Sequence, residues 1–329
     1  MLYLKIFQTA GFLGAQFTNG FLLFLIQLKG VKLFGSYRYV ISSFTLYTFL
    51  YTWIEILTQP VMHIYGPIFV VYMDSALKYE KSIGEFIVCL YCASFALCIS
   101  LLATQFYTRY LAICRPERFK IFNGPQLCLL FIPSLICFIL WFSFVWFGMQ
   151  NTKVKQEYLR EVLLSNYNES SNDVSFIAPM YWKPDENNVK RYDFYEISAS
   201  AGCVLIIVSC LSTIIFCIIR IYNRLHQKTA TMSNRTKDIN KQILKTLCLQ
   251  TILPIIMMYT PVGLFIVFPL FEIGVGKFAN IVGASLGVYP SLEPLFPLIC
   301  IREFRRTILC WFSRPTEVHT KVSTSVKTL

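Results

Sequence analysis

The sequence FIVCLYCASFALCISLLATQFYTRYLAI, residues 86–113, decides the fold class of this chain. Its only charged side chain is Arg109, close to the C-terminal end of the stretch. A helix that crosses the hydrocarbon core of a bilayer needs about 20 mostly apolar residues. The stretch exceeds that length, so it predicts a membrane-spanning helix with an arginine at one end.

Six further stretches have the length and composition of membrane spans. They are residues 6–28, 38–60, 127–148, 196–219, 243–267 and 279–300. Polar residues such as Gln8, Gln16 and Asn19 weaken the first, and the second continues past Pro60 and is expected to break there. We therefore expect an all-α membrane protein, a seven-transmembrane helix bundle that forms one domain over residues 1–329.

The composition of the 329 residues agrees with a membrane protein. The chain is 55% hydrophobic and 15% charged, whereas soluble domains are about 25% charged. Most of the 12 cysteines lie in or beside apolar stretches, where cysteine acts as a small apolar side chain. We expect no disulfide framework. No cleavable signal peptide is apparent before Lys29, so the first helix is expected to serve as its own insertion signal.

Basic side chains are concentrated in alternate connections. With the N-terminus outside, the inner segments are 29–38, 109–126, 220–245 and 302–329, with 20 Lys and Arg against 4 Asp and Glu. The outer segments hold 10 Lys and Arg and 12 Asp and Glu. Short loops rich in Lys and Arg stay in the cytoplasm. This predicts an outer N-terminus, a cytoplasmic C-terminus and an odd number of spans, and it assigns the net charge of +12 to the membrane rather than to nucleic acid.

Residues 301–313 have the pattern of an amphipathic helix on the inner leaflet, because basic and apolar side chains alternate along them. The basic ones are Arg302, Arg305 and Arg306. Cys310 is a candidate for palmitoylation or stays unmodified. Residues 314–329 are expected to form a flexible tail.

The end of the third span carries a recognisable motif. Thr108-Arg109-Tyr110, followed by Leu-Ala-Ile-Cys-Arg-Pro, resembles the Asp/Glu-Arg-Tyr motif and second inner loop of rhodopsin-like receptors. Arg109 could be a simple anchor at the inner surface, or it could face a partner when neighbouring helices separate. Because Thr108 stands where an acid is usual, a local arginine–carboxylate lock is either absent or supplied elsewhere.

Four segments together are similar to the nematode serpentine chemoreceptor family Str and its relative Srj. They are Leu-Phe-Gly-Ser-Tyr-Arg-Tyr at 33–39, residues 104–110, Leu-Gln-Thr-Ile-Leu-Pro at 249–254 and Tyr-Pro-Ser-Leu-Glu-Pro-Leu at 289–295. The resemblance runs from about residue 5 to 310. It implies a rhodopsin-like receptor in the plasma membrane of sensory neurons, at their cilia, that detects small environmental chemicals through a heterotrimeric G protein.

The resemblance also implies functions for residues near the inner face. The expected G-protein coupling residues are Arg109, Tyr110, Arg115, Arg224 and Arg305. Anionic membrane lipid alone could also explain this basic surface. Pro254 marks either a moving bend or a static kink in the sixth span. Glu293-Pro294 resembles the Asn/Asp-Pro-x-x-Tyr motif with Glu for the first residue and Pro297 for the Tyr, and we favour a hydrogen-bonded or ion-linked structural role for Glu293 over catalysis.

The ligand pocket is expected in the outer half of the bundle. The candidate residues are Glu55, Tyr91, Ser94, Phe95, Met258, Tyr259 and Asn280. An aromatic and methionine lining suits a small, mostly apolar ligand, although each residue could equally belong to the helix-packing core. Glu55 could bind a cationic or hydrogen-bonding ligand group or pair with an inner polar residue.

The polar segment 149–195 is the expected second outer loop. It contains the sequon Asn168-Glu169-Ser170, a candidate for glycosylation. It contains no cysteine, so the disulfide that usually ties such a loop to the third span cannot form, and we expect packing alone to hold the loop.

Other classes of protein fit the sequence less well. The three histidines, His63, His226 and His319, lie in different loops, and the spans hold only the acids Glu55 and Glu293, one near each side of the bilayer. We therefore expect no enzyme, no cofactor and no metal site. A ligand-gated channel or a small-molecule transporter is the alternative. Channel-type insect odorant receptors place the N-terminus inside, which the Lys and Arg count opposes.

Overall fold

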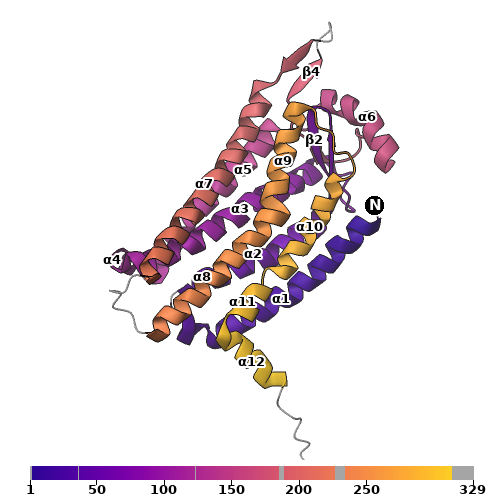
Figure 1. Cartoon of the computed structure of the whole chain (residues 1–329). Coiled ribbons are helices and arrows are strands. Elements are labelled where there is room, and N and C mark those ends of the chain that lie inside the picture. The colour runs from indigo at the N-terminus through magenta and orange to yellow at the C-terminus, as the bar shows by residue number, and fades with distance from the viewer. Residues whose placement is uncertain (1, 36, 123, 185–188, 227–233, 313–329) are drawn as a thin grey trace, which may run out of the picture.

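Long helices lie side by side in an elongated bundle, and strands and one short helix cover one end of it (Figure 1). The computed structural model describes residues 2–35, 37–122, 124–184, 189–226 and 234–312. The long helices are α1 (Leu2–Phe34), α2 (Tyr37–Thr58), α3 (Lys81–Cys114), α5 (Ile132–Gly148), α7 (Phe194–His226), α8 (Asn234–Pro254) and α10 (Ala279–Leu292). The predicted tail, 314–329, lies outside the described residues.

Within those residues, six helices are long and apolar enough to cross a membrane. A seventh span is counted when Ala279–Cys300 and Arg302–Cys310, which meet at an angle of 91°, are taken together. The first of these parts is itself divided into α10 and α11 (Leu295–Cys300) around Pro294, which has no N–H to donate to the helix. Six to seven spans are consistent with a seven-helix bundle, and α12 (Arg302–Phe312) follows the last one.

The sixth span is continuous but unevenly wound. Helix α8 runs to Pro254, the π-helical turn Ile255–Tyr259 follows, and α9 (Thr260–Val267) and the short helical turn Phe268–Phe271 complete the span. A proline removes one backbone donor, and π-helical turns accommodate such interruptions inside longer helices. Pro254 therefore marks a change of winding in the middle of this span.

The expectation of an all-α protein is wrong at one end of the molecule. Helix α2 ends at Thr58, as the proline at 60 predicted, but the apolar run beyond it forms a hairpin of β1 (Pro60–Tyr65) and β2 (Ile68–Met73). The hairpin turns at Gly66, whose φ of 54° suits glycine. β3 (Phe176–Ile177) adds to β2, and β4 (Trp182–Pro184) pairs with β5 (Lys190–Tyr192).

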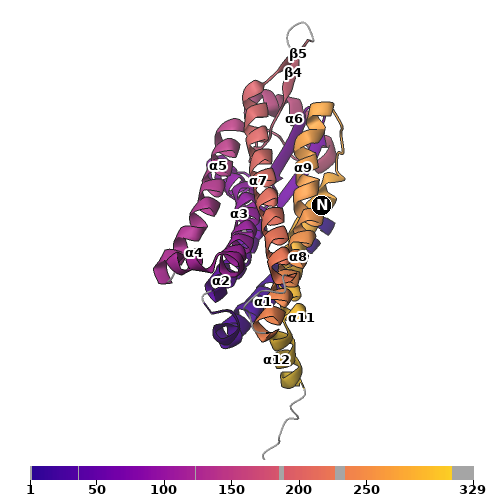
Figure 2. The same cartoon turned by 60° about the vertical axis from the view of Figure 1, so that its left-hand side comes forward.

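The hairpin lies between the bundle and helix α6 (Lys153–Tyr167) and is buried on both faces. Met62, Phe69 and Val71 pack into the main core of the bundle. Residues on the opposite face, such as Val70, pack against Leu159 of α6 in a second core. This two-sided burial explains why the run is apolar throughout and resembles a membrane helix in sequence. We call this part of the molecule the sheet end; Figure 2 shows β4 and β5 projecting beyond it.

The segment 149–195 is held by more than packing, which corrects the sequence-based expectation. β3 is hydrogen-bonded to β2, and the buried Lys155 of α6 forms an ion pair of 3.0 Å with Glu196 at the start of α7. Burial lowers the pKa of Lys155, whereas the charge of Glu196 raises it. All twelve cysteines are free, so pairing of strands and of charges takes the place of a disulfide.

The polar residues that weaken the first span in sequence join it to its neighbours. Gln16 donates a hydrogen bond of 2.7 Å to the Thr52 hydroxyl on α2, and Asn19 donates one of 2.9 Å to the Pro290 carbonyl oxygen on α10. Glycines bring the same helices together, because a β-carbon at Gly11 would lie 2.1 Å from the Gly287 carbonyl oxygen. Such small residues let membrane helices approach closely.

Candidate functional site

An apolar cavity of about 60 Å³ lies inside the bundle beneath the sheet end. Strands supply part of its wall through Met62, Phe69, Val71 and Ile177. Helices supply the rest, including Tyr91, Cys92, Phe95, Trp141, Val145, Met149, Cys203, Val262, Ile266 and Leu286. The wall contains no charged side chain, so the cavity suits an uncharged, mostly apolar molecule.

Aromatic rings form a frame around this cavity. Phe95 on α3 lies between Trp141 on α5, at a ring-centroid distance of 5.6 Å, and Tyr259 of the sixth span, at 5.0 Å. Tyr91 stacks on Tyr51 of α2 at 6.1 Å. Offset and edge-to-face contacts of this kind stabilise aromatic pairs. The frame connects α2, α3, α5 and the sixth span. The helical part of the cavity wall itself comes from α3, α5, α7, the sixth span and α10.

Two of the predicted pocket residues, Tyr91 and Phe95, line the cavity. Tyr259 contacts Phe95 from outside the wall. Ser94 does not line the cavity, and its hydroxyl donates to the Leu90 carbonyl oxygen of the same helix at 2.8 Å. Met258 is buried in the core without reaching the wall.

Asn280 fastens the hairpin to α10 instead of lining the cavity. Its Oδ1 accepts a hydrogen bond of 2.9 Å from the Met62 backbone N–H, and its Nδ2 donates to the Tyr167 hydroxyl at 3.2 Å. The same hydroxyl lies 2.8 Å from Nδ1 of His63 on β1. Burial, helped by the charge of Lys277, lowers the pKa of His63 to about 4. These contacts join β1, α6 and α10.

Glu55 lies beside the aromatic frame and not on the cavity wall. It is 3% exposed, and its Oε1 has no hydrogen-bond partner among the described residues. A β-carbon on Gly287 would lie 2.8 Å from that oxygen and 3.3 Å from Cγ of Gln8, whose own Oε1 also lacks a partner. The carboxyl group therefore faces the junction of α1, α2 and α10.

The strands that form part of the cavity wall were not predicted from the sequence. The signal was present in the run 60–73, where β-branched and aromatic residues flank Gly66-Pro67. Such a glycine between two apolar runs of this composition is typical of a hairpin. Because the run is apolar apart from His63, its composition favoured a continuation of the second span.

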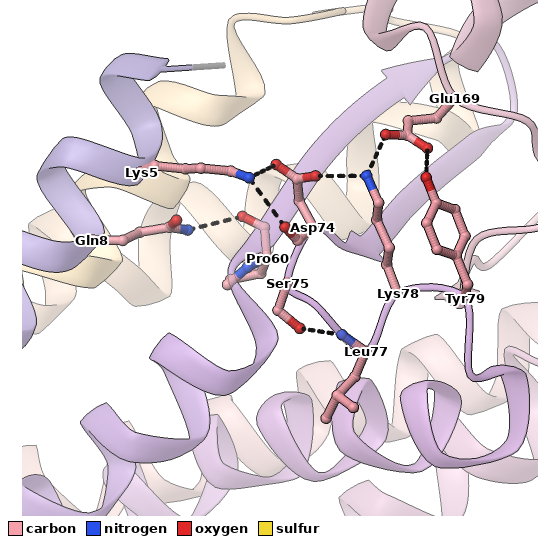
Figure 3. Close-up of polar contacts among 9 residues, drawn as sticks. All are labelled: Lys5, Gln8, Pro60, Asp74, Ser75, Leu77, Lys78, Tyr79 and Glu169. Atoms are coloured by element: carbon pink, nitrogen blue, oxygen red, sulfur yellow. Dashed lines mark hydrogen bonds and ion pairs between the residues drawn. The ribbon is translucent and has the colours of Figure 1, made fainter.

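A cluster of charged and polar side chains joins the first helix to the sheet end (Figure 3). Lys5 of α1 forms an ion pair of 2.9 Å with Asp74 after β2, and Lys78 lies 3.5 Å from Asp74 and 2.5 Å from Glu169. Tyr79 donates to Glu169 at 3.3 Å. The neighbouring Asn168, the sequon residue, is exposed and caps α6 with a φ of 58°.

The opposite end of the molecule is basic, and we call it the basic end. Arg115, Arg224 and Arg305 are exposed there, whereas Tyr110 is half-buried and packs edge-on against Phe216 at 5.6 Å. Arg109 differs from the other arginines, because it is 7% exposed and its guanidinium carbon lies 3.5 Å from the centroid of the Tyr37 ring. The structure thus separates three exposed arginines from one enclosed arginine.

Helix α12 is attached to the basic end by an aromatic contact. The Phe304 ring is buried and packs edge-on against Phe34 of α1 at 5.9 Å. Arg302, Arg305 and the thiol-bearing Cys310 are exposed on it. This arrangement leaves basic groups and a cysteine on the outer surface of a helix that turns by 91° from the preceding span.

Glu293 is completely buried between the sixth and seventh spans. Its Oε1 accepts a hydrogen bond from the Gln250 side chain, and its Oε2 has no partner among the residues that the structure describes. Gln250 lies one helical turn before Pro254, at the start of the change in winding. A buried polar contact therefore links the sixth span to the seventh at the point where both are irregular.

No group of three or more His, Cys, Asp or Glu side chains within the described ranges could hold a metal ion.

A helical membrane protein with an apolar cavity near one end and a buried arginine at the other has the plan of a seven-helix receptor. Residues 4–309 match the sequence profile of the family described as serpentine type 7TM GPCR chemoreceptor Str. The chain belongs to this family. It is a multi-pass membrane receptor and not an enzyme, as the sequence predicted.

Similar proteins occur in nematodes. The serpentine receptor class r-10 of Caenorhabditis briggsae is 31% identical over 317 residues, which cover 94% of this chain and 92% of that protein. The G-protein coupled receptor str-33 of Caenorhabditis elegans is 24% identical over 297 residues, covering 89% and 86%. The serpentine receptor class J-38 of Caenorhabditis elegans is 24% identical over 325 residues, covering 96% and 95%.

Proposed function

We propose that this chain is a chemosensory receptor that binds a small, uncharged, mostly apolar chemical in the cavity beneath the sheet end. In this proposal the sheet end faces the outside, the basic end faces the cytoplasm, and a heterotrimeric G protein binds at the basic end. The receptor is placed in the plasma membrane, at the cilium of a sensory neuron. The concentration of exposed Arg and Lys at one end supports this orientation.

The single observation that carries the proposed ligand class is the composition of the cavity wall. Its side chains are aromatic, aliphatic and sulfur-bearing, and none is charged. The cavity of about 60 Å³ is smaller than the roughly 300–1,000 Å³ of drug-sized ligand sites. A very small ligand fits with little rearrangement, whereas a larger one has to displace the hairpin or the aromatic frame.

The proposed signal passes from the cavity to the basic end through the sixth span. Val262 and Ile266 of that span line the cavity, and Tyr259 contacts the cavity residue Phe95. The π-helical turn that ends at Tyr259 leads to Pro254 and then to Gln250, which is bonded to Glu293. We infer that a ligand shifts the equilibrium between two arrangements of this span.

The remaining surface residues have supporting roles in the proposal. Arg115, Arg224 and Arg305, with Tyr110, form the G-protein contact surface around Arg109. Helix α12 rests on anionic lipid of the inner leaflet, and its exposed Cys310 is a palmitoylation site. The exposed Asn168 is glycosylated at the outer surface.

The test is a screen of volatile and water-soluble chemicals against the receptor expressed with a promiscuous G protein. We expect Arg109→Ala to reach the cell surface and to lose ligand-driven G-protein activation. The control is Arg118→Ala, since Arg118 is an exposed arginine of the same end outside the proposed contact set. Normal signalling by Arg109→Ala would remove this residue from the mechanism. Protection of an N-terminal tag from antibody in intact cells would overturn the orientation.

A further inference from the structure

Within the residues that the structure describes, Arg109 has no acidic partner at the basic end. The preceding residue, Thr108, donates its hydroxyl to the Thr104 carbonyl oxygen at 2.7 Å. Among the described acidic side chains none forms an ion pair with Arg109. A buried guanidinium without a counter-charge is unfavourable, so another group has to stabilise Arg109 in this arrangement of the helices.

The ring of Tyr37 is the group that contacts the charge. The guanidinium carbon lies 3.5 Å from the ring centroid, well inside the roughly 6 Å over which a cation is attracted to an aromatic face. Tyr37 is 3% exposed and Arg109 is 7% exposed, and this attraction is stronger where water is excluded. Since Tyr37 is the first residue of α2, the stack joins α2 to the end of α3.

The stack leaves hydrogen-bonding capacity unused. Nε and Nη2 of Arg109 and the hydroxyl of Tyr37 have no hydrogen-bond partner within the described part of the chain. An aromatic face attracts the charge without accepting the directed N–H donors of a guanidinium. A partner that offers carbonyl or carboxylate oxygens could satisfy these donors with charge-assisted hydrogen bonds. The stack is therefore a contact that such a partner can replace.

The surroundings connect the stack to the sixth span. A small cavity of about 20 Å³ adjoins Tyr37, and its wall includes Ile243 and Gln250 of α8 and Phe304 of α12. Gln105, one turn before Arg109 on α3, also lines this cavity, and its Nε2 has no partner among the described atoms. Because α8 forms one side of this cavity, displacement of α8 would open the stack toward the basic end.

We propose that Tyr37 is an aromatic clamp that holds Arg109 inside the resting receptor. The ring takes the place of the carboxylate that is usual at position 108, where this chain has Thr108. Binding of the G protein then exchanges the ring face for oxygen acceptors on the partner. This inference rests on the proposed coupling role of Arg109 and assigns its regulation to Tyr37. Loss of the ring favours the released arginine, so it should raise signalling without ligand and leave the ligand response in place.

The test weakens the ring without changing its size. Tyr37 is replaced by phenylalanine and by phenylalanines with one, two and three ring fluorines, and ligand-independent G-protein activation is measured per receptor at the cell surface. Fluorine withdraws electron density from the face that attracts the cation. We expect Tyr37→Phe to stay close to the wild type, because the ring face that contacts the guanidinium is retained. Basal activation should then rise with each fluorine, to about tenfold for the weakest ring and for Tyr37→Leu.

Two controls make the result specific. Tyr39 carries a comparable contact at the surface, with Arg38 at 4.6 Å from its ring and 54% exposure, so Tyr39→Leu should leave basal activation unchanged. Adding Arg109→Ala to Tyr37→Leu should abolish the gain, since the effect passes through the arginine.

Equal basal activation across the fluorinated series, with normal surface expression and normal ligand responses, would overturn the clamp and leave G-protein coupling through Arg109 intact. Full ligand-driven signalling by Arg109→Ala alone would instead overturn the proposed coupling role on which the clamp depends. The two failures are distinguishable because the first concerns activity without ligand and the second concerns the response to it.

Discussion

Gln250 of α8 donates a side-chain hydrogen bond to the buried carboxyl group of Glu293, between α10 and α11. We expect Glu293→Leu and Gln250→Leu each to lower the stability of the detergent-solubilised receptor by about 1–3 kcal/mol, because each leaves a buried polar group without its partner. The double variant should lose less than the sum of the single losses, since apolar replacement of both partners removes the unpaired group. Thermal unfolding of the four proteins measures this coupling.

Thr251→Val is a matched control for this cycle. The Thr251 side chain is buried on the same helix, and among the described residues its hydroxyl bonds to the Leu247 carbonyl oxygen within its own helix. The stability lost in Thr251→Val should be the same whether residue 293 is Glu or Leu. Strictly additive losses for Gln250 and Glu293 would show that the contact contributes nothing between the two spans.

Val145 lines the cavity beneath the sheet end and is 2% exposed. We expect Val145→Phe to fill the cavity and to reduce the response to any ligand found by screening by at least about tenfold in the concentration required, a change of about 1.4 kcal/mol in binding free energy. Val208→Phe is the control, because Val208 is 52% exposed on α7 and faces away from the core. A normal dose–response curve for Val145→Phe, with normal surface expression, would place the ligand elsewhere.

Helices α1 and α10 lie side by side in the bundle (Figure 1). Their backbones touch at Gly11 and Gly287. Gly11→Ala should lower thermal stability, because the added β-carbon would meet the Gly287 carbonyl oxygen at 2.1 Å and force the helices apart. Gly20→Ala on the same helix meets no atom within 4 Å and should be neutral or slightly stabilising, since alanine favours a helix more than glycine does. Equal effects of the two substitutions would contradict the close helix contact.

Much of the bundle could be predicted from the sequence, because each spanning helix is specified by one continuous stretch of residues. An apolar run long enough to cross a bilayer specifies a helix whatever surrounds it, as in α3 and α7. The break beside Pro60 was predictable for the same reason, since proline restricts its own backbone. The amphipathic pattern after residue 301 likewise predicted the short helix α12.

The hairpin and the cavity wall depend on contacts that are distant in sequence. Strand β2 is stabilised by β3 and by α6, which both lie far along the chain from it, at Phe176–Ile177 and Lys153–Tyr167. An apolar run buried on both faces also lacks the alternation typical of a strand. Of the candidate pocket residues on α3, Tyr91 and Phe95 line the cavity. The partner of Arg109 was not predictable, because Tyr37 lies on another helix and no local rule pairs the two.

His63 provides a pH-dependent contribution to the stability of the sheet end. Its pKa is about 4 in the folded protein against an ordinary value of 6.5, chiefly because burial disfavours the charged ring. Between these values the unfolded form binds more protons, so the stabilising contribution is complete above pH 6.5 and is lost as the pH falls toward 4. We expect the melting temperature of the solubilised receptor to fall over this range, and His63→Gln to fall less steeply. The comparison between the two proteins removes the contribution of carboxyl groups, which titrate in both. Parallel curves for wild type and His63→Gln would show that the pKa of His63 is the same in the folded and unfolded states. The contact of His63 with Tyr167 would then tolerate protonation.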